Sequence, residues 1–167
     1  MDNFDFYSPT YFAFGRGREN EVGDLVKRFG GTRVLIHYGG GSAERSDLLS
    51  RIRASLEESG IAYKELGGVK PNPRSGLVYE GIDLVRKEGI DMILAVGSGV
   101  INDICKVVAH ATGRPCAVVG TAPSMDGYAS NSSSMELNHV KVSLYNHGPE
   151  GILLDSEILA QAPMRML

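Results

Sequence analysis

The stretch Ile93-Leu94-Ala95-Val96-Gly97-Ser98-Gly99-Val100-Ile101-Asn102-Asp103 decides the fold of this chain. An apolar run ends at a glycine-serine-glycine turn, and a helical pattern begins directly after it. Glycines let a backbone come close to an anion, and the first free amides of a helix point towards it. The stretch therefore predicts a buried strand, a turn and a helix start that together hold a pyrophosphate. An ordinary tight turn is the alternative, because no third glycine completes the common dinucleotide fingerprint.

A second glycine turn, Gly39-Gly40-Gly41-Ser42, also follows an apolar strand pattern. Three residues without side chains leave room for a ribose or an adenine ring. Ser42 and the nearby Arg45 could accept a 2′-phosphate, so the sequence favours NADP slightly over NAD. Two such turns in one chain indicate a nucleotide with more than one polar group to bind.

The order of the remaining patterns predicts an α/β fold. Strands are expected at residues 11–15, 33–38, 61–66, 92–96 and 115–119, and helices at 19–29, 47–59 with Ser46 as N-cap, 77–88 and 100–112. Largely apolar strands that alternate with helices are typical of a parallel sheet covered on both faces, which is a Rossmann-like architecture. A β-hairpin (135–137 and 140–145), a last strand (152–155) and a helical turn (157–160) are expected to follow.

The bulk composition narrows the class of protein. The 167 residues fit one domain, residues 1–167, with a net charge of −3 and a pI of about 5.8, which argues against nucleic acid as a partner. No apolar run approaches the roughly 20 residues of a membrane span, and no signal peptide is visible. Cys105 and Cys116 lie in apolar patterns and are expected to be buried, reduced thiols. A cytoplasmic protein that does not bind a membrane is the expectation.

A small, polar segment from Thr121 to Ser134 follows the strand at 115–119. A flexible linker is one interpretation, but a binding loop at the edge of the sheet is favoured because Met125, Asp126 and Tyr128 are unusual in linkers. Asp126 could bind a substrate hydroxyl or support a nearby metal. An Asx turn before Gly127 explains the same residue equally well.

Other chemistry receives little support from the sequence. Asn102 and Asp103 stand in the first helical turn, where the Asp103 carboxylate would repel a phosphate and is expected to cap or orient the turn. The four histidines show no metal-ligand spacing, so no metal site is expected from this chain alone. Neither a nucleophile elbow nor a P-loop is present, and no residue is assigned a catalytic role.

These motifs resemble the nucleotide-binding half of the iron-containing alcohol dehydrogenase and glycerol dehydrogenase superfamily, which also includes dehydroquinate synthase. Asn3-Phe4, Phe12-Ala13-Phe14-Gly15, Tyr38 to Ser42 and Val69-Lys70-Pro71-Asn72-Pro73 resemble butanol dehydrogenases. The segments Gly97 to Asp103 and Thr121 to Ser130 resemble sn-glycerol-1-phosphate dehydrogenases. The chain is therefore interpreted as a hybrid of two branches, natural or engineered.

The resemblance implies a role for each matched segment. Gly39, Gly40, Gly41 and Ser42 would meet the adenosine ribose, and Gly97, Ser98 and Gly99 the pyrophosphate. Thr121 and Ser124 would line the nicotinamide side, Asp126 would contact a polyol substrate, and Pro71 and Asn72 would lie near the cofactor entry. In the family, a helical domain supplies an Asp and His ligands to zinc or iron, which polarises the substrate hydroxyl.

The family's metal-binding Asp follows a segment like the one at which this sequence stops, so nucleotide binding without useful turnover is expected from the chain by itself. Two further hypotheses remain. The chain could be an engineered or truncated α/β scaffold that binds no cofactor, or it could self-associate, as a dimer through the early strand or through an exposed cleft face.

Overall fold

The protein is built around one six-stranded parallel sheet. The computed structural model describes residues 7–39, 47–69, 75–125, 127–128, 130–137 and 140–164. The sheet consists of β1 (Tyr11–Gly15), β2 (Arg33–Gly39), β3 (Ala62–Val69), β4 (Met92–Gly97), β5 (Cys116–Gly120) and β8 (Gly151–Asp155), in the spatial order β1-β8-β5-β4-β2-β3. Every neighbouring pair is parallel. The Rossmann-like α/β architecture predicted from the sequence is confirmed, and the predicted last strand, β8, joins the five strands of the alternating part of the chain in the same sheet.

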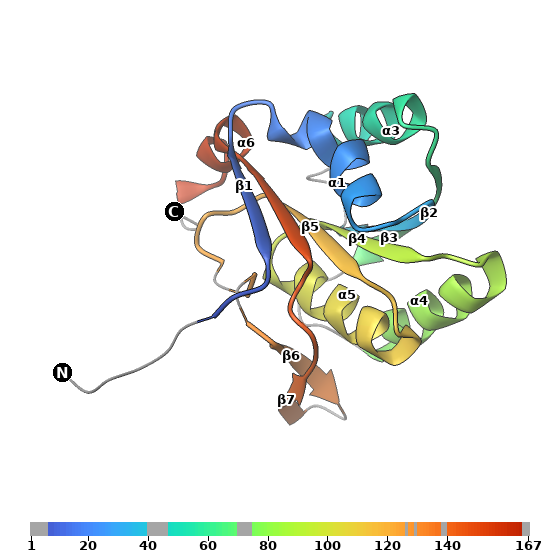
Figure 1. The fold of residues 1–167 in the computed structure, drawn as a ribbon. Helices are drawn as coiled ribbons and strands as arrows, with labels where there is room; N and C mark the ends of the chain where they lie inside the picture. The colour runs from blue at the N-terminus through green and yellow to red at the C-terminus, as the bar shows by residue number, and fades with distance from the viewer. Residues whose placement is uncertain are drawn as a thin grey trace.

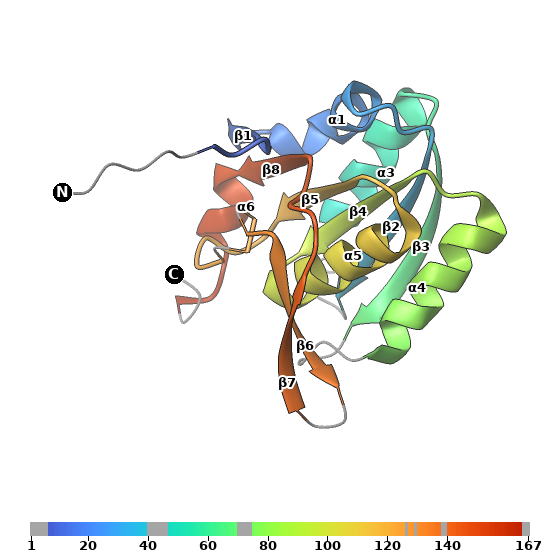
Figure 2. The ribbon, with the colours of Figure 1, turned by 60° about the horizontal axis from the view of Figure 1, so that its bottom comes forward.

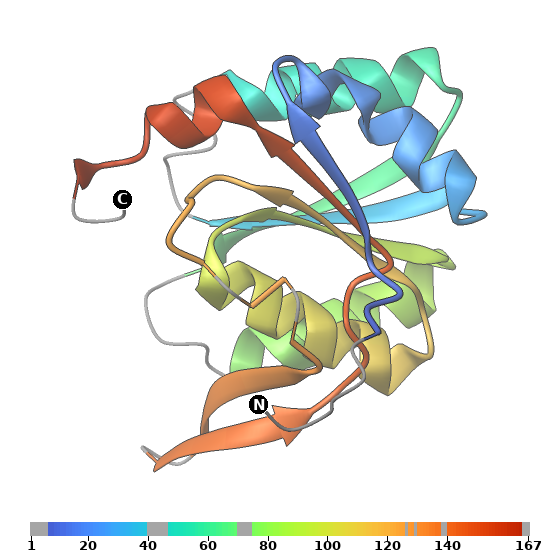
Figure 3. The same cartoon turned by 60° about the vertical axis from the view of Figure 1, so that its left-hand side comes forward.

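Helices cover both faces of this sheet (Figure 1). They are η1 (Arg18–Glu21), α1 (Val22–Arg28), α3 (Leu48–Glu58), α4 (Ser75–Glu88), α5 (Gly99–Thr112) and α6 (Ser156–Ala160). Helices α1, α3 and α6 lie on one side and α4 and α5 on the other, as the edge-on view in Figure 3 shows. Because each face is covered, the central strands lose contact with water on both sides.

The central strand β4 shows why the apolar run of the sequence is unbroken. Met92 and Leu94 pack into the core beneath α1 and α3, whereas Ile93 and Ala95 pack beneath α4 and α5. All six residues of β4 are buried. Side chains alternate between the faces of a strand, so a strand that is covered twice needs apolar residues at every position.

The hairpin starts earlier than the sequence predicted. Strands β6 (Ser132–Leu137) and β7 (Val140–Tyr145) pair antiparallel and project beyond the sheet (Figure 2). The first three residues of β6 are serines of the predicted loop, which lack strand propensity. They are ordered by tertiary contacts instead, since Met135 packs against α5 and Asn146 donates a 2.7 Å hydrogen bond to the Ser133 hydroxyl.

Two helix starts also differ from the expectation. The N-cap of α3 is Asp47, with φ 58°, and not Ser46, which lies outside the described residues. The short α6 is capped by Asp155 at the end of β8, whose carboxylate accepts from the amides of Glu157 and Ile158 at 2.8 and 2.9 Å. The other oxygen of Asp155 accepts from Gly17 and Arg18 and so ties the start of η1 to β8.

Candidate functional site at the carboxyl ends of β2 and β4

The order of the strands reverses between β2 and β4. From β2 the chain crosses through α3 to β3 at one edge, and it then returns through α4 on the opposite face to β4, on the other side of β2. In open α/β sheets such a reversal leaves a crevice at the carboxyl ends of the two strands, where ligands bind. Gly39 ends β2 and Gly97 ends β4, one residue beyond the paired Tyr38 and Val96. The two glycine turns of the sequence therefore begin side by side at this crevice.

Ile101 explains why both positions are glycines. Gly97 has a φ of +151°, and a Cβ built on it would lie 2.3 Å from Cδ1 of Ile101. The same Cδ1 atom would lie 3.0 Å from a Cβ on Gly39. The first turn of α5 therefore packs directly onto the ends of β2 and β4, and a side chain at Gly97 would force Ile101 to shift, whereas one at Gly39 would require a smaller adjustment.

The start of α5 presents free amides. Ser98 is the N-cap, and its carbonyl accepts from the amides of Ile101 and Asn102, each at 3.1 Å. Within the described residues, no protein acceptor is found for the amides of Gly99 and Val100. The Ser98 side chain makes no capping hydrogen bond either. Two N–H groups at the positive end of the helix dipole are thus available to an anion.

Asn102 adds an unsatisfied acceptor beside these amides. Its side chain is 1% exposed, and its amide nitrogen donates to the carbonyl of Gly127 at 3.2 Å. Its Oδ1 atom has no hydrogen-bond partner in the described part of the chain. A buried carbonyl without a donor costs stability. The start of α5 thus combines two amides without acceptors and one buried oxygen without a donor within the described residues.

The loop after β5 crosses over the start of α5. A Cβ on Gly99 would lie 3.4 Å from the sulfur of Met125, and the amide of Thr121 donates to the carbonyl of Gly97 at 3.2 Å. Tyr128 packs back onto Gly120 and donates to the carbonyl of Ala122 at 3.4 Å. Burial raises the pKa of the Tyr128 phenol to about 12. The segment is therefore a folded part of the site and not a free linker.

Lys106 fixes this loop to α5 through hydrogen bonds from its ammonium group. Its side chain is fully buried, and its ammonium donates to the carbonyl of Gly127 at 3.2 Å, to the hydroxyl and carbonyl of Ser130 at 3.2 and 3.4 Å, and to the carbonyl of Ser132. Sequence reasoning missed this residue. The sequence did contain a sign of its role, because Lys106 lies on the apolar side of α5, one turn after Asn102. A lysine at such a position can be buried only if its ammonium has hydrogen-bond partners.

Asp103 belongs to the same polar cluster. Its carboxylate accepts from the amide of Ser134 at 3.2 Å and lies 3.5 Å from the Lys106 ammonium. Burial raises the pKa of the Asp103 carboxyl, although the Ser134 amide and the Lys106 charge act in the opposite direction. Asp103 was expected to cap or orient the glycine turn, but in the structure its carboxylate contacts Ser134 and Lys106 and so anchors the beginning of β6.

Only some of the predicted binding residues lie at the crevice within the described structure. Gly39, Gly97, Ser98, Gly99, Asn102 and Thr121 lie around it, and the exposed Ser124 lies in the loop beside it. Other predicted residues, namely Gly40, Gly41, Ser42, Pro71, Asn72 and Asp126, lie outside the described residues. Their roles stay predictions.

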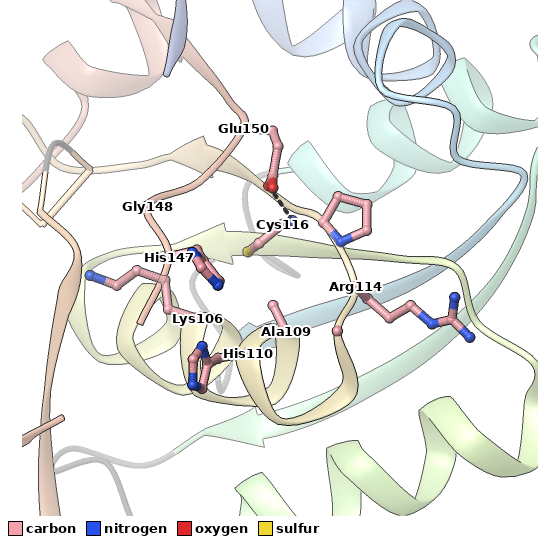
Figure 4. A pocket seen from close by; sticks show the side chains of 10 residues that line it. Lys106, Ala109, His110, Arg114, Cys116, His147, Gly148 and Glu150 are labelled. Carbon is pink, nitrogen blue, oxygen red and sulfur yellow. Dashed lines mark hydrogen bonds between the residues drawn. The ribbon is translucent and has the colours of Figure 1, made fainter. Parts of the chain in front are cut away.

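Four further observations concern the rest of the molecule. A cavity of about 330 Å³ lies at the opposite, amino-terminal edge of β5 and β8 (Figure 4). In the described ranges, no three or more His, Cys, Asp or Glu side chains are placed to share a metal ion. None of the described helices is both long and apolar enough for a membrane crossing. Cys105 and Cys116 are buried free thiols, as predicted.

Comparison with known proteins places this geometry in a family. The sequence model described as "Iron-containing alcohol dehydrogenase" matches residues 13–163. NADH-dependent butanol dehydrogenase A of Clostridium acetobutylicum is 44% identical over 109 residues, which is 65% of this chain and 28% of that enzyme. Glycerol-1-phosphate dehydrogenase [NAD(P)+] of Thermococcus kodakarensis is 28% identical over 95% of this chain and 44% of its own.

Solved structures agree with these sequence matches. The crystal structure of NADH-dependent butanol dehydrogenase A from Thermotoga maritima superposes with a TM-score of 0.93 at 27% identity, covering 99% of this chain and 47% of that one. The chain thus spans less than half of the enzymes that it matches here. Since the family model covers nearly the whole sequence, this chain belongs to the iron-containing alcohol dehydrogenase family.

Proposed function

We propose that this chain binds NADP or NAD at the start of α5, as the single cofactor-binding domain of a metal-dependent alcohol or polyol dehydrogenase. One observation carries the proposal: the amides of Gly99 and Val100 are without protein acceptors in the described structure, directly beside the strand-order reversal. The pyrophosphate accepts from these amides, and the orphaned Asn102 oxygen accepts from a hydroxyl or amide of the same ligand.

The activities of the relatives support the cofactor class and the range of substrates. Butanol dehydrogenases that use NADH, an NADPH-dependent aldehyde reductase of Escherichia coli and glycerol-1-phosphate dehydrogenases that use NAD(P)+ all match this sequence. Identities of 44% and 35% to two of these branches support a chain that combines features of both. An alcohol or a polyol phosphate is therefore the proposed substrate class, and a cytoplasmic location stays a prediction.

The free edge of the sheet supports self-association. Among the described strands, β1 ends the sheet and pairs with β8 alone, and its Phe12 and Phe14 side chains are 47% and 64% exposed. An unpaired edge with exposed aromatic residues is a surface on which a second copy can continue the sheet. Size-exclusion chromatography tests this part, because a monomer at high concentration contradicts it.

Titration with NADPH and NADH tests the cofactor site. The chain contains no tryptophan, so nicotinamide fluorescence can be followed without interference from protein tryptophan. Ser98→Asp keeps a good N-cap residue at α5 but places a carboxylate where the pyrophosphate would bind. We expect it to weaken binding by at least about tenfold, which is roughly 1.4 kcal/mol, while its melting temperature stays equal or rises.

Ser98→Ala is the matched control. The Ser98 hydroxyl makes no capping bond, so its removal should leave α5 intact, and this variant should bind NADPH more tightly than Ser98→Asp because it adds no negative charge. Failure of the unsubstituted chain to bind either nucleotide at millimolar concentration would favour the alternative of a scaffold that binds no cofactor. Equal NADPH affinities of Ser98→Asp and Ser98→Ala would mean that the nucleotide does not bind at the start of α5.

A further inference from the structure

Two histidines meet in the cavity at the amino-terminal edge of the sheet. His110 stands in the last turn of α5, and His147 stands in the connection from β7 to β8. Their ring centroids are 5.2 Å apart, with an angle of 45° between the ring planes. Figure 4 shows both rings inside the cavity, next to one another. The cavity is about 330 Å³ and lies at the opposite end of α5 from the proposed cofactor site.

This separation matches two imidazoles on one tetrahedral metal ion. With Zn–N bonds of about 2.1 Å and a tetrahedral angle, the centroids of two coordinated rings are roughly 5 Å apart. Among the described residues, neither ring has a hydrogen bond to another protein group. Both side chains are exposed, so an ion can reach their nitrogen atoms from solvent.

The backbone on both sides of the pair is already fixed. His110 is part of a helix that ends in a left-handed Gly113 cap, whose amide returns to Ala109 and His110. The connection that carries His147 is held by the amide of Asn146 on the Asn131 carbonyl at 2.6 Å and by the amide of Glu150 on the Cys116 carbonyl at 2.8 Å. Binding therefore orders little more than two side chains, which lowers its entropic cost.

The local charge also suits a cation. The carboxyl end of α5 carries the negative end of the helix dipole, and the Glu150 carboxylate lines the same cavity. Two cationic side chains line it as well, but they are directed elsewhere. The Lys106 ammonium is bound to the loop after β5, and Figure 4 shows the Arg114 guanidinium pointing away from the two rings.

We propose that His110 and His147 together bind one divalent d-block ion, with Zn²⁺ as the reference ion and water in the remaining positions. Imidazole nitrogens favour such ions over Mg²⁺ and Ca²⁺, which prefer oxygen ligands. The bound ion joins the end of α5 to the connection that leads into β8. The sequence spacing of the histidines hid this pair, since only the fold brings the two residues together.

Calorimetric titration of the metal-free, full 167-residue chain with ZnCl₂ tests the site. One Zn²⁺ per chain with micromolar affinity is the expected result, and MgCl₂ should give no heat of binding. His110→Gln and His147→Gln should each weaken Zn²⁺ binding by at least about tenfold. Arg114→Gln removes a charge from the same cavity without removing a ligand, and it should bind Zn²⁺ at least as well as the original chain.

Proton competition gives a second readout. Metal binding to imidazole competes with protons, so the Zn²⁺ affinity should be weaker in acid than at neutral pH. A double variant that binds like the original chain, a stoichiometry of half an ion per chain, or no Zn²⁺ binding at all would each overturn the proposal. Melting curves without metal confirm that the variants fold, and an unchanged NADPH affinity shows that the outcome is independent of the proposed cofactor site.

Discussion

The ammonium group of Lys106 on α5 lies 3.2 Å from the carbonyl oxygen of Gly127, in the loop that crosses the start of the same helix. The amide of Asn102 reaches this same oxygen, also at 3.2 Å. One helix thus presents its free amides at its first turn and fixes the covering loop from its second turn. The geometry of the crevice therefore depends on a buried charge that does not itself face the proposed ligand.

Replacing Lys106 by Met should destabilise the protein severely. The change leaves the Asp103 carboxylate and several loop carbonyls without their donor, a loss of about 3–5 kcal/mol for a broken buried ion pair. Urea denaturation measures the free energy of unfolding, and the exposed Lys87→Met on α4 serves as the control. Adding Asp103→Asn should recover about 1–2 kcal/mol, because the partner is then uncharged. Equal stabilities of Lys106→Met and Lys87→Met would contradict the role of this lysine.

Gly97→Ala should destabilise the protein by about 2 kcal/mol or more. The new methyl group would lie 2.3 Å from Ile101 Cδ1, on a backbone with φ +151°. Gly76→Ala is the matched control, because Gly76 lies in α4 with open space around its Cα. It should stabilise by up to about 1 kcal/mol through helix propensity. Thermal melts of the two variants should shift in opposite directions, and a shared direction would show that the Gly97 turn is not tightly packed.

His37 should make stability depend on pH. Burial lowers the pKa of the His37 imidazole, although its hydrogen bond with the Leu66 carbonyl and the nearby Glu80 partly oppose this effect. Its Nε2 atom is buried without a partner in the described structure. Protonation therefore favours the unfolded chain, and stability should fall as the pH drops below about 6.5, the value of an unperturbed histidine.

A His37→Gln variant isolates this contribution. The glutamine amide can still donate towards the Leu66 carbonyl but does not titrate. Free energies of unfolding measured between pH 7 and pH 5 should therefore fall less steeply for the variant than for the original chain. Parallel slopes would assign the acid sensitivity to other groups, such as Asp155, whose carboxyl keeps a lowered pKa despite burial because it accepts hydrogen bonds from backbone amides.

The two cysteines should be unreactive in the folded protein. Burial raises the pKa of both the Cys105 and the Cys116 thiol, so little thiolate forms and access is blocked. A colorimetric thiol reagent should label neither cysteine under native conditions and both of them in denaturant. Rapid labelling of one thiol in the folded chain would reveal an opening of the core between α5 and β5.

The apolar and glycine patterns predicted the fold because each depends on the burial or the backbone conformation of residues that are adjacent in the sequence. The continuous run Met92 to Val96 favoured a strand covered on both faces, and Gly97 favoured a tight turn at its end; both features are present in the structure. The start of β6 at Ser132 could not be predicted in this way. Serines have no strand preference of their own, and this segment is ordered by Lys106 and Asp103 from a distant helix.

By itself, the sequence determined the alternation of strands and helices, the buried thiols and the glycine turn at the start of α5, because these features depend on residues close together in the chain. Only the tertiary structure decided which residues that are far apart in the sequence come into contact. It placed Gly39 beside Gly97 against one isoleucine, buried Lys106 beneath a loop, and brought His110 to His147. Such contacts depend on the order of strands in the sheet, which no local pattern of residues encodes.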